Sequence, residues 1–560
     1  MKTSHPTPRL RSLTPWGAGG VVQGLAAVLW LPQAALLAWA VDRLASPAGG
    51  VGLDAVLVPA AGVLLLGALR ATAEAWGLRR VFAAARRYVS DLRAQVAAVL
   101  AARSPLDAAR PASGLAASVV AEQAEAVLPY LVRYQPARWR AMVVPLLILP
   151  TVAYFSWAAA LVLLVAAPLI PIFMALVGWR AQAASAAQMV EMGQMNAFLL
   201  DRLRGLATLR ALDAVDATAL RLGASAQSLR QRTMVVLRIA FLSSAVLELF
   251  AALGVAMVAA YVGFHLLGSI PWGSWGQRLS LAEGLFILLL APAFFEPLRE
   301  LAAVWHDRAA GEAALAALAE LAEDGVPLPG AAVAPTGVRS LGAPSVQVND
   351  LHFGHLGETP VFTGFGLRVA PGEHVALMGA SGAGKTALLH LLAGLVPAQQ
   401  GRIRIGGVLL TDASVSALRQ RMGWIGQKPH IFAGSVQDHL VLGRSDVAST
   451  EVRAALQQAG LGRVAQAGVG VALGEGGTGL SGGEQVRLAL ARMVLHADAD
   501  LLLVDEPTAH LDTETAQGVV DALLQFAQGK TLIAATHDPV LAARMHRVVQ
   551  LDADAVRAAA

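Results

Sequence analysis

A glycine-rich octapeptide between two apolar stretches constrains the fold of this chain more than any other feature. Residues 379–386 read Gly-Ala-Ser-Gly-Ala-Gly-Lys-Thr and fit the pattern G-x-x-x-x-G-K-[ST]. An apolar run typical of a strand, 374–378, precedes the octapeptide, and one typical of a helix, 387–393, follows it. This strand–loop–helix order is the context that a phosphate-binding loop requires. The pattern therefore predicts a nucleotide site.

The chemistry of the loop follows from its residue types. Its backbone N–H groups are expected to surround phosphate oxygens, and the N-terminus of the following helix adds positive potential. Lys385 is expected to reach the β- and γ-phosphates, and the Thr386 hydroxyl to bind Mg²⁺. The residues expected to contribute the backbone cradle are Gly379, Ala380, Ser381, Gly382, Ala383 and Gly384.

The composition is that of a membrane protein with more than one domain. The 560 residues are 56% hydrophobic and only 15% charged, and the mean hydropathy is +0.56. There are no cysteines, which excludes disulfides, thiolate nucleophiles and cysteine-ligated metals. The net charge of +4 is small for this length, and no nucleic-acid partner is expected.

Long apolar segments fill the first half of the chain and predict six membrane-spanning helices, each near the required length of about 20 residues. The first follows a polar N-terminus, has no evident cleavage site, and is predicted to be a retained span. The segments are 17–41, 53–75, 138–155, 158–179, 239–267 and 279–301.

Arginines are distributed unequally among the connections between these segments. They are concentrated between the second and third and between the fourth and fifth, at positions 79, 80, 86, 87, 93, 103, 110, 180, 202, 204, 210, 221, 230 and 232. The positive-inside rule then places both connections, and both termini, in the cytoplasm. Both connections are alanine-rich, so they are expected to continue the membrane helices into the cytosol.

A change of composition divides the chain. Residues 324–344 are rich in Pro, Gly and Ala, and short strand-like and helical runs of a soluble α/β type follow. The predicted domains are a six-helix membrane domain over 1–325, a linker over 326–345 and an α/β nucleotide-binding domain over 346–560.

Further motifs supply the groups that hydrolysis needs. The apolar run 501–504 ends in Asp505, predicted to hold Mg²⁺, and Glu506, predicted to polarise the attacking water.

The stretch 480–484, Leu-Ser-Gly-Gly-Glu, resembles the signature of the ATP-binding-cassette (ABC) family, with Glu484 in place of the usual glutamine. The Ser481 hydroxyl and the N–H groups of Gly482 and Gly483 lie before a helix predicted over 485–495, a geometry that suits an anion. Along the chain the motifs follow in the order phosphate-binding loop, Gln427, signature, the acids Asp505 and Glu506, and His537. Together they identify the chain as a member of that family.

The resemblance implies roles for three more residues. Gln427 fits the family's Q-loop, whose amide is expected to ligate Mg²⁺ and sense the γ-phosphate, and His537 fits the switch histidine, which is expected to contact the γ-phosphate. Asp512 fits the D-loop. His355 stands where the family usually has an adenine-stacking tyrosine.

Membership of this family implies a particular assembly. Six spans followed by one cassette resemble an ABC exporter half-transporter. In such dimers each ATP lies between the phosphate-binding loop of one chain and the signature of the other. The resemblance also implies that the cytoplasmic helix ends near 112–119 and 203–212 transmit closure of the cassettes to the membrane helices.

The membrane half is similar to a narrower family. Residues 168–178, 198–210, 231–238, 242–244 and 290–299 are similar to CydD subunits. That resemblance implies a CydC-like partner half-transporter, cysteine or glutathione as cargo, the bacterial inner membrane with its lipids as location, and support of cytochrome bd assembly. A link to cytochromes suggests haem, for which His265 is the only histidine well within a predicted span.

Cargo with carboxylates requires cationic groups in the membrane domain, where ionisable residues are costly and usually functional. The ionisable candidates are Arg70, Glu74, Arg238, Glu248, Glu296 and Arg299. Arg70 and Arg238 are preferred for a substrate cavity, although Arg70 is spaced i, i+4 from Glu74, Arg238 is able to reach the interface, and Glu296 is spaced to pair with Arg299. Two alternatives stay open at this point: another cargo, such as a lipid, peptide or drug, and a regulatory subunit whose own ATP site turns over poorly.

Overall fold

The computed structural model describes most of the chain in two compact units. The described residues are 17–45, 54–111, 113–323, 325–331, 342–354, 359–432, 434–442, 444, 447–474, 479–496 and 498–551. One unit comprises Met1–Ala97 and Pro111–Glu323, and the other Ala98–Arg110 and Asp324–Ala560. Each unit is described by itself.

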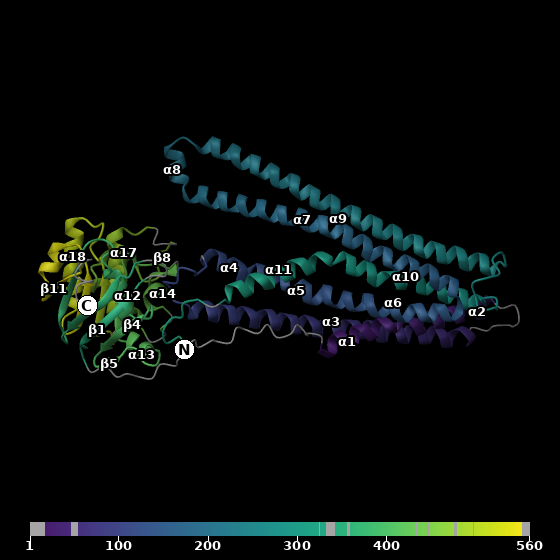
Figure 1. Ribbon diagram of the computed structural model, residues 1–560, viewed down its shortest axis with the longest axis horizontal. Helices are drawn as coiled ribbons and strands as arrows, with labels where there is room; N and C mark the ends of the chain where they lie inside the picture. The colour runs from purple at the N-terminus through teal and green to yellow at the C-terminus, as the bar shows by residue number, and fades with distance from the viewer. Residues whose placement is uncertain are drawn as a thin grey trace. The chain divides into compact units, whose positions relative to one another are not determined.

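Within its described part, the first unit consists of helices and the loops that connect them (Figure 1). Its helices are α1 (Gly17–Val28), α2 (Trp30–Ala45), α3 (Asp54–Ala102), α4 (Ser113–Ala121), η1 (Gln123–Ala126), α5 (Val127–Pro129), η2 (Tyr130–Tyr134), α6 (Gln135–Phe155), α7 (Trp157–Arg204), α8 (Leu206–Ala211), α9 (Val215–Leu266), α10 (Leu281–Ala303) and α11 (Trp305–Leu321).

Three helices are far longer than a membrane is thick. α3, α7 and α9 have 49, 48 and 52 residues, about 70–80 Å at 1.5 Å per residue against a hydrocarbon core of about 30 Å. The arginine-rich connections are therefore helical continuations of the membrane segments, as predicted. α8 closes the long α7–α9 hairpin, and α4 follows α3. Both short helices lie where transmission of cassette closure was predicted, a role that stays a prediction.

Apolar helices able to cross a membrane account for the predicted spans. Within the described residues, five helical stretches meet the criteria of length and composition: Gly19–Ala45, Val56–Ala102, Ser113–Phe155, Ala245–Leu266 and Leu281–Leu321. A shorter apolar stretch, Trp157–Leu169, begins α7 and corresponds to the fourth predicted span. The first span is broken at Leu29, between α1 and α2.

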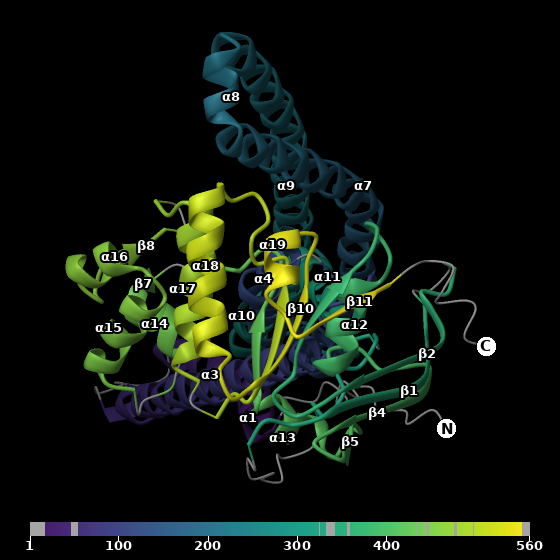
Figure 2. The same cartoon turned by 90° about the vertical axis from the view of Figure 1, so that its left-hand side faces the viewer.

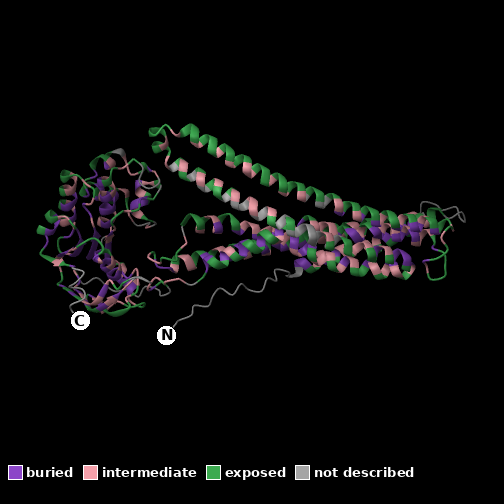
Figure 3. Cartoon of the chain, turned by 45° about the horizontal axis from the view of Figure 1, so that its top comes forward, coloured by how far each residue is buried: buried purple, intermediate pink, exposed green. Residues whose placement is uncertain are grey.

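The core of this unit lies where these segments pack together. Its largest fully buried side chains include Leu163, Ile148, Ile287, Phe294 and Phe295. Gly254 of α9 allows close packing, because a Cβ there would lie 2.5 Å from the Phe295 ring. Away from this core, the α7–α9 hairpin is coloured mainly as exposed or intermediate (Figure 3).

The second unit is an α/β domain built around a parallel sheet of order β11-β3-β10-β9-β6. An antiparallel sheet, β2-β1-β4-β5, and a helical part, α14–α17, lie on opposite sides of these strands (Figure 2). The strands are β1 (Val346–Phe353), β2 (Phe362–Val369), β3 (His374–Met378), β4 (Gln400–Ile405), β5 (Val408–Leu409), β6 (Met422–Ile425), β7 (Gly434–Ser435), β8 (Ala472–Leu473), β9 (Leu501–Asp505), β10 (Thr531–Ala535) and β11 (Arg547–Gln550). The helices are α12 (Lys385–Leu392), α13 (Val415–Arg419), α14 (Val436–Val441), α15 (Ser449–Gln458), α16 (Gly462–Ala467), α17 (Gly482–Val494), α18 (Thr513–Phe526) and α19 (Pro539–Ala543).

A short segment from the first half of the sequence belongs to this second unit. The backbone N–H of Ser104 donates to Val326 O at 2.9 Å, and the Ser104 hydroxyl donates to Leu395 O at 2.6 Å. Leu328 N donates to Ala102 O at 2.8 Å. These bonds explain why residues 98–110 group with the cassette. The predicted domain boundaries remain a prediction, and half of the predicted linker, residues 332–341, lies outside the described residues.

Candidate active site: an ATP site at the carboxyl edge of the parallel sheet

The register of the parallel strands brings distant motifs to one edge. Ala535 pairs with Asp505 in β9 and with Leu377 in β3, so these three strands end at the same level. The phosphate-binding loop follows β3, and His537 follows β10. Gln427 follows β6, which pairs with β9. Carboxyl ends of neighbouring parallel strands form the usual ligand site of an open α/β sheet.

The phosphate-binding loop has a conformation that only glycine adopts without strain. Gly384 has φ +91°, and a Cβ there would lie 2.6 Å from a methyl carbon of Val361. The loop leads directly into α12, which begins at Lys385. Backbone N–H groups at the start of this helix have no intrahelical acceptor and are available to phosphate.

Lys385 lies at the centre of the site and is only 7% exposed. Its Nζ donates to Gly379 O at 2.9 Å, to Ala380 O at 3.1 Å and to His537 Nε2 at 2.9 Å. An ammonium group only donates, so Nε2 of His537 accepts here. The two side chains predicted to contact the γ-phosphate therefore meet one another.

The predicted Mg²⁺ ligands also lie together. The Thr386 hydroxyl donates to Asp505 Oδ2 at 2.9 Å. Asp505 is 2% exposed, its Oδ1 is buried without a hydrogen-bond partner in the described structure, and burial raises the pKa of its carboxyl. A buried carboxylate oxygen without a donor beside a hydroxyl is a donor set that suits Mg²⁺.

Glu506 is held toward His537 by its backbone and its side chain. It has φ +49°, an unusual value for a residue with a Cβ, and its N–H donates to Ala535 O at 2.9 Å. Its Oε2 accepts from the backbone N–H of His537 at 3.2 Å, and its Oε1 lies 3.5 Å from Nε2 of that ring. Strained residues of this kind concentrate at functional sites.

A cavity of about 550 Å³ joins residues of four predicted motifs. Ser381, Gln427, Glu506 and His537 all line it. The D-loop lines it as well, through residues 508–511, and Asp512 caps α18 by accepting from Thr515 N at 2.9 Å. His355, the predicted adenine-stacking residue, lies outside the described residues.

The signature begins helix α17, one turn earlier than predicted. Ser481 is its N-cap, with its hydroxyl accepting from Glu484 N at 3.3 Å, and Gly482 and Gly483 form the first turn. Gly483 allows close packing on α18, because a Cβ there would lie 2.4 Å from a methyl carbon of Thr515. The signature residues are thereby presented on a rigid helix end.

Glu484, the departure from the usual signature, completes the cap and adds a negative charge. Its Oε2 accepts from the Ser481 backbone N–H at 2.8 Å and from the Ser481 hydroxyl at 2.9 Å. These hydrogen bonds lower the pKa of the Glu484 carboxyl, so it is ionised at neutral pH. The anion therefore occupies donors that a phosphate would use.

The substitution Glu484→Gln is expected to raise the ATP affinity of the composite site containing this signature by about 2–5-fold, since a charge at a helix N-terminus is worth about 0.3–1 kcal/mol. Glutamine keeps the cap through its amide oxygen. The measurement is nucleotide titration of the assembled transporter. Glu451→Gln, which removes a glutamate from the first turn of α15, is the matched control. Equal ATP affinities of the wild-type protein, Glu484→Gln and Glu451→Gln would contradict the expectation.

His439 of α14 makes the cassette sensitive to acid. It is 2% exposed, and burial, with Arg492 and His430 nearby, lowers its pKa from 6.5 to about 4. Between these two values the unfolded chain binds more protons than the folded one, so the free energy of unfolding falls as pH drops. At pH 5.5 the loss relative to pH 7.5 is about 1 kcal/mol. His439→Gln should remove that part of the pH dependence of thermal unfolding, whereas His306→Gln, at an exposed ring, should not.

Comparison with known proteins agrees with this architecture. The family model described as ABC transporter matches residues 362–509, and the model described as ABC transporter transmembrane region matches residues 139–288. The transport ATP-binding protein AarD of Providencia stuartii is 37% identical over 80% of this chain and 76% of its own. The glutathione/L-cysteine transport system ATP-binding/permease protein CydD of Escherichia coli is 35% identical over 86% of this chain and 82% of its own.

The chain belongs to the CydD family of ABC transporter subunits. It is a multi-pass membrane protein with an ATPase domain that binds ATP. CydC proteins of E. coli and Bacillus subtilis also match. A bacterial Atm1-family ABC exporter with ATP bound has the same fold, with a TM-score of 0.74 over 95% of this chain and 94% of that one at 22% identity.

In this CydD-family chain the two residues predicted to line a substrate cavity lie in different settings. Arg70 of α3 lines a cavity of about 380 Å³ in the membrane unit and pairs with Glu74 at 3.0 Å. Arg238 of α9 is exposed and does not line that cavity. Of the other ionisable candidates, Glu296 lines it, while Arg299 pairs with Glu248 at 2.7 Å and with Glu296.

The sequence reasoning missed two charged residues of this cavity. Arg140 of α6 and Glu300 of α10 line it and form an ion pair at 2.9 Å. Both lie within predicted spans, 138–155 and 279–301, so an ionisable residue in an apolar segment was the signal that could have found them.

His265, the only histidine considered for haem, is a poor fit for it. The ring is 2% exposed and packs against Tyr261 with 5.7 Å between centroids. Its Nε2 lies 3.4 Å from the Ser274 hydroxyl and 3.4 Å from Leu279 N. A macrocycle needs an open face beside the ring nitrogen, and this burial leaves none.

Proposed function

We propose that this chain is one half of a heterodimeric exporter that uses ATP to move cysteine or glutathione, or both, out of the cytoplasm across the bacterial inner membrane. The main support for this proposal is the similarity to a glutathione/L-cysteine transport protein over 86% of the chain, which includes the membrane half. Support of cytochrome bd assembly is part of the proposal. The partner is a CydC-like half-transporter.

The ATP site supports a hydrolytic role for this subunit. Glu506 is positioned as the base that accepts a proton from the attacking water, and His537 as the group that contacts the γ-phosphate. The backbone of residues 379–384 and Lys385 would hold the phosphates, and Ser481, Gly482 and Gly483 would complete the partner's site. Thr386, Gln427 and Asp505 would hold Mg²⁺, which neutralises phosphate charge when bound.

The surface of the α7–α9 hairpin supports assembly with a second half-transporter. Large apolar side chains project from its described residues and are more than half exposed, including Leu203, Leu212 and Leu220 at 59%, 70% and 77%. Exposed apolar side chains gathered on one element favour a protein partner or lipid. The arginines between the fourth and fifth predicted spans, which lie in this hairpin, favour a cytoplasmic location for the cassette and for both termini.

The test is uptake of labelled cysteine and glutathione into inverted membrane vesicles, with this chain alone and with its co-expressed partner. ATP-dependent accumulation only with both chains is the expected result. Accumulation of neither thiol by the assembled transporter, with ATP turnover intact, would refute the cargo and favour another substrate.

One observation favours unequal ATP sites in the assembled dimer. Glu484 places a carboxylate on the signature that would face the partner's nucleotide. The two composite sites would then be unequal, with turnover concentrated at the site holding Lys385 and Glu506 of this chain. Separate inactivation of the two sites is the test. Turnover concentrated at this chain's site is lost in Glu506→Gln, whereas the alternative of a regulatory subunit, whose own ATP site turns over poorly, requires turnover to survive that substitution.

A further inference from the structure

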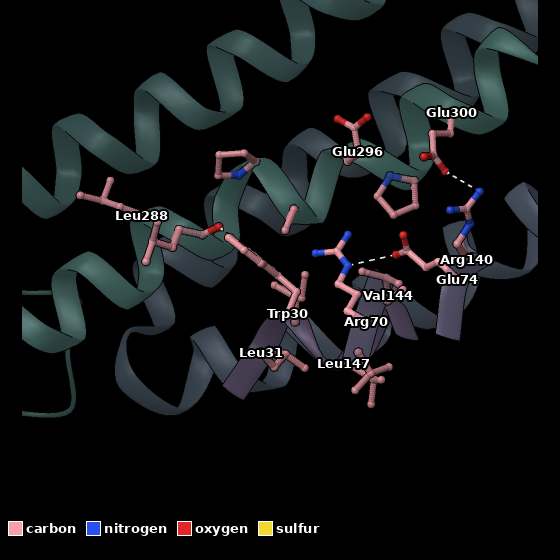
Figure 4. Close-up of a pocket in the computed structure, with 17 residues that line it drawn as sticks. Trp30, Leu31, Arg70, Glu74, Arg140, Val144, Leu147, Leu288, Glu296 and Glu300 are labelled. Carbon is pink, nitrogen blue, oxygen red and sulfur yellow. Dashed lines mark hydrogen bonds and ion pairs between the residues drawn. The ribbon is translucent and has the colours of Figure 1, made fainter. Parts of the chain in front are cut away.

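A cavity of about 380 Å³ lies among α1, α2, α3, α6 and α10 of the membrane unit (Figure 4). Its walls combine apolar side chains, including Leu31, Val144 and Leu147, with five charged ones. Its volume is that of a small-molecule site. The charged residues that line it are Arg70, Glu74, Arg140, Glu296 and Glu300.

These charges form two ion pairs on facing helices. Arg70 pairs with Glu74 within α3, and Arg140 of α6 reaches Glu300 of α10 at 2.9 Å. All four side chains remain 31–43% exposed, so they border open space rather than the packed core. Arg70 also lies 5.7 Å from the centroid of the ring of Trp30 in α2. Figure 4 shows the two pairs close together at one end of the cavity.

Prolines add backbone acceptors to the same walls. A proline inside a helix removes the hydrogen bond to the carbonyl four residues earlier. Pro292 and Pro297 of α10 thereby deprive the carbonyls of Leu288 and Ala293 of that bond, and both residues line the cavity. In a membrane, helices interrupted in this way are tolerated where they border protein or an aqueous cavity.

The charged end of the cavity lies toward the inner side of the membrane segments. Counting at 1.5 Å per residue from the outer ends of α3, α6 and α10, Arg70, Arg140 and Glu296 lie at a depth of about 22–24 Å, and Glu300 at about 28 Å. The hydrocarbon core is about 30 Å thick. A polar molecule would reach this end from the side on which the long helices continue.

We propose that this cavity binds a zwitterion with amino-acid termini, its carboxylate taken by Arg140 and Arg70 and its ammonium by Glu300 with help from the freed carbonyls. Two arginines and three glutamates around one cavity suit a ligand that carries both charges. They do not suit a lipid tail, which needs an apolar wall, or a polyanion, which needs excess positive charge. On binding, the ligand exchanges with the Arg140–Glu300 pair, while the guanidinium of Arg70, which has five donors, keeps Glu74 and also donates to the carboxylate, so no charge is left unpaired.

This inference rests on the proposed function for its setting, since cysteine and glutathione are both zwitterions, but its test does not depend on transport. The assembled transporter, reconstituted in lipid nanodiscs without nucleotide, is titrated with L-cysteine, N-acetyl-L-cysteine, which lacks the ammonium, and L-cysteine ethyl ester, which lacks the carboxylate. L-Alanine serves as a zwitterion without a thiol.

The wild-type protein is expected to bind L-cysteine at least about 10-fold more tightly than either blocked analogue, since hydrogen bonds to charged groups are worth about 10–100-fold. Glu300→Gln should reduce the preference for L-cysteine over N-acetyl-L-cysteine to within about 2-fold and leave unchanged the preference for L-cysteine over its ethyl ester. Arg140→Gln should do the reverse. Glu191→Gln, which removes a glutamate from an ion pair with Arg232 outside the cavity, should preserve both preferences.

Equal binding of all three thiols to the wild-type protein, or unchanged preferences in Glu300→Gln and Arg140→Gln, would overturn the proposal. Glu300→Asp keeps the charge and separates loss of charge from loss of folding: it should retain a preference for the free ammonium. If vesicles accumulate neither thiol but the pattern of preferences holds, with L-alanine bound as well, the cavity assignment stands and the thiol cargo fails.

Discussion

Glu506→Gln is expected to lower ATP turnover by about 10²–10⁴-fold, the usual contribution of a positioned general base. Glutamine keeps the shape of the side chain but cannot accept a proton from water. ATP should still bind, because Lys385 and the loop are untouched, and the ATP-bound closed dimer should accumulate. Phosphate release and retention of labelled ATP, measured on the transporter assembled with its partner, check both parts.

The matched control is Glu514→Gln, a first-turn glutamate of α18 in the same domain that is exposed and does not line the nucleotide cavity. It should turn over ATP at the wild-type rate. Undiminished turnover in Glu506→Gln would remove this residue from the catalytic role and shift hydrolysis to the partner's site.

Lys385→Ala is expected to weaken ATP binding at this site by about 10–100-fold, the range for losing a charged hydrogen-bond donor. The effect on turnover should be at least as large, because the lysine is buried and no other side-chain cation in the described site contacts His537. Equilibrium binding of a fluorescent ATP analogue, with the partner's site inactivated, measures the change.

Lys530→Gln is the control for removing a lysine, since Lys530 lies over the Phe526 ring, outside the nucleotide cavity. Its ATP affinity should match that of the wild-type protein. Wild-type affinity in Lys385→Ala would show that the loop backbone alone holds the phosphates and that the predicted role of the lysine is wrong.

Local patterns predicted much of the fold. The apolar run before Gly379 is strand β3, and the run ending in Asp505 is β9. The membrane segments and their long helical continuations follow from apolar length and alanine content. Helix α17 begins at Gly482 rather than Gln485 because Ser481 and Glu484 form a capping box, a short-range signal present in the sequence.

The membrane cavity could not be predicted in the same way. Arg70 and Glu74 are neighbours on one helix and their pairing follows from spacing. Arg140 and Glu300 are 160 positions apart in the sequence, and only the packing of α6 against α10 brings them within 2.9 Å. Arg238 met the same sequence criterion as Arg70, yet the fold places it on an exposed face of α9.

What the sequence determined by itself is the set of chemical groups and their local settings: a phosphate-binding loop between a strand and a helix, a capped signature, acids at a strand end and six apolar segments. These features depend on residues close together in the chain, where spacing decides geometry. Only the tertiary structure decided which groups meet. The parallel register brings Lys385 to His537 and Thr386 to Asp505, and helix packing brings Arg140 to Glu300, because contacts between distant residues depend on how whole elements pack.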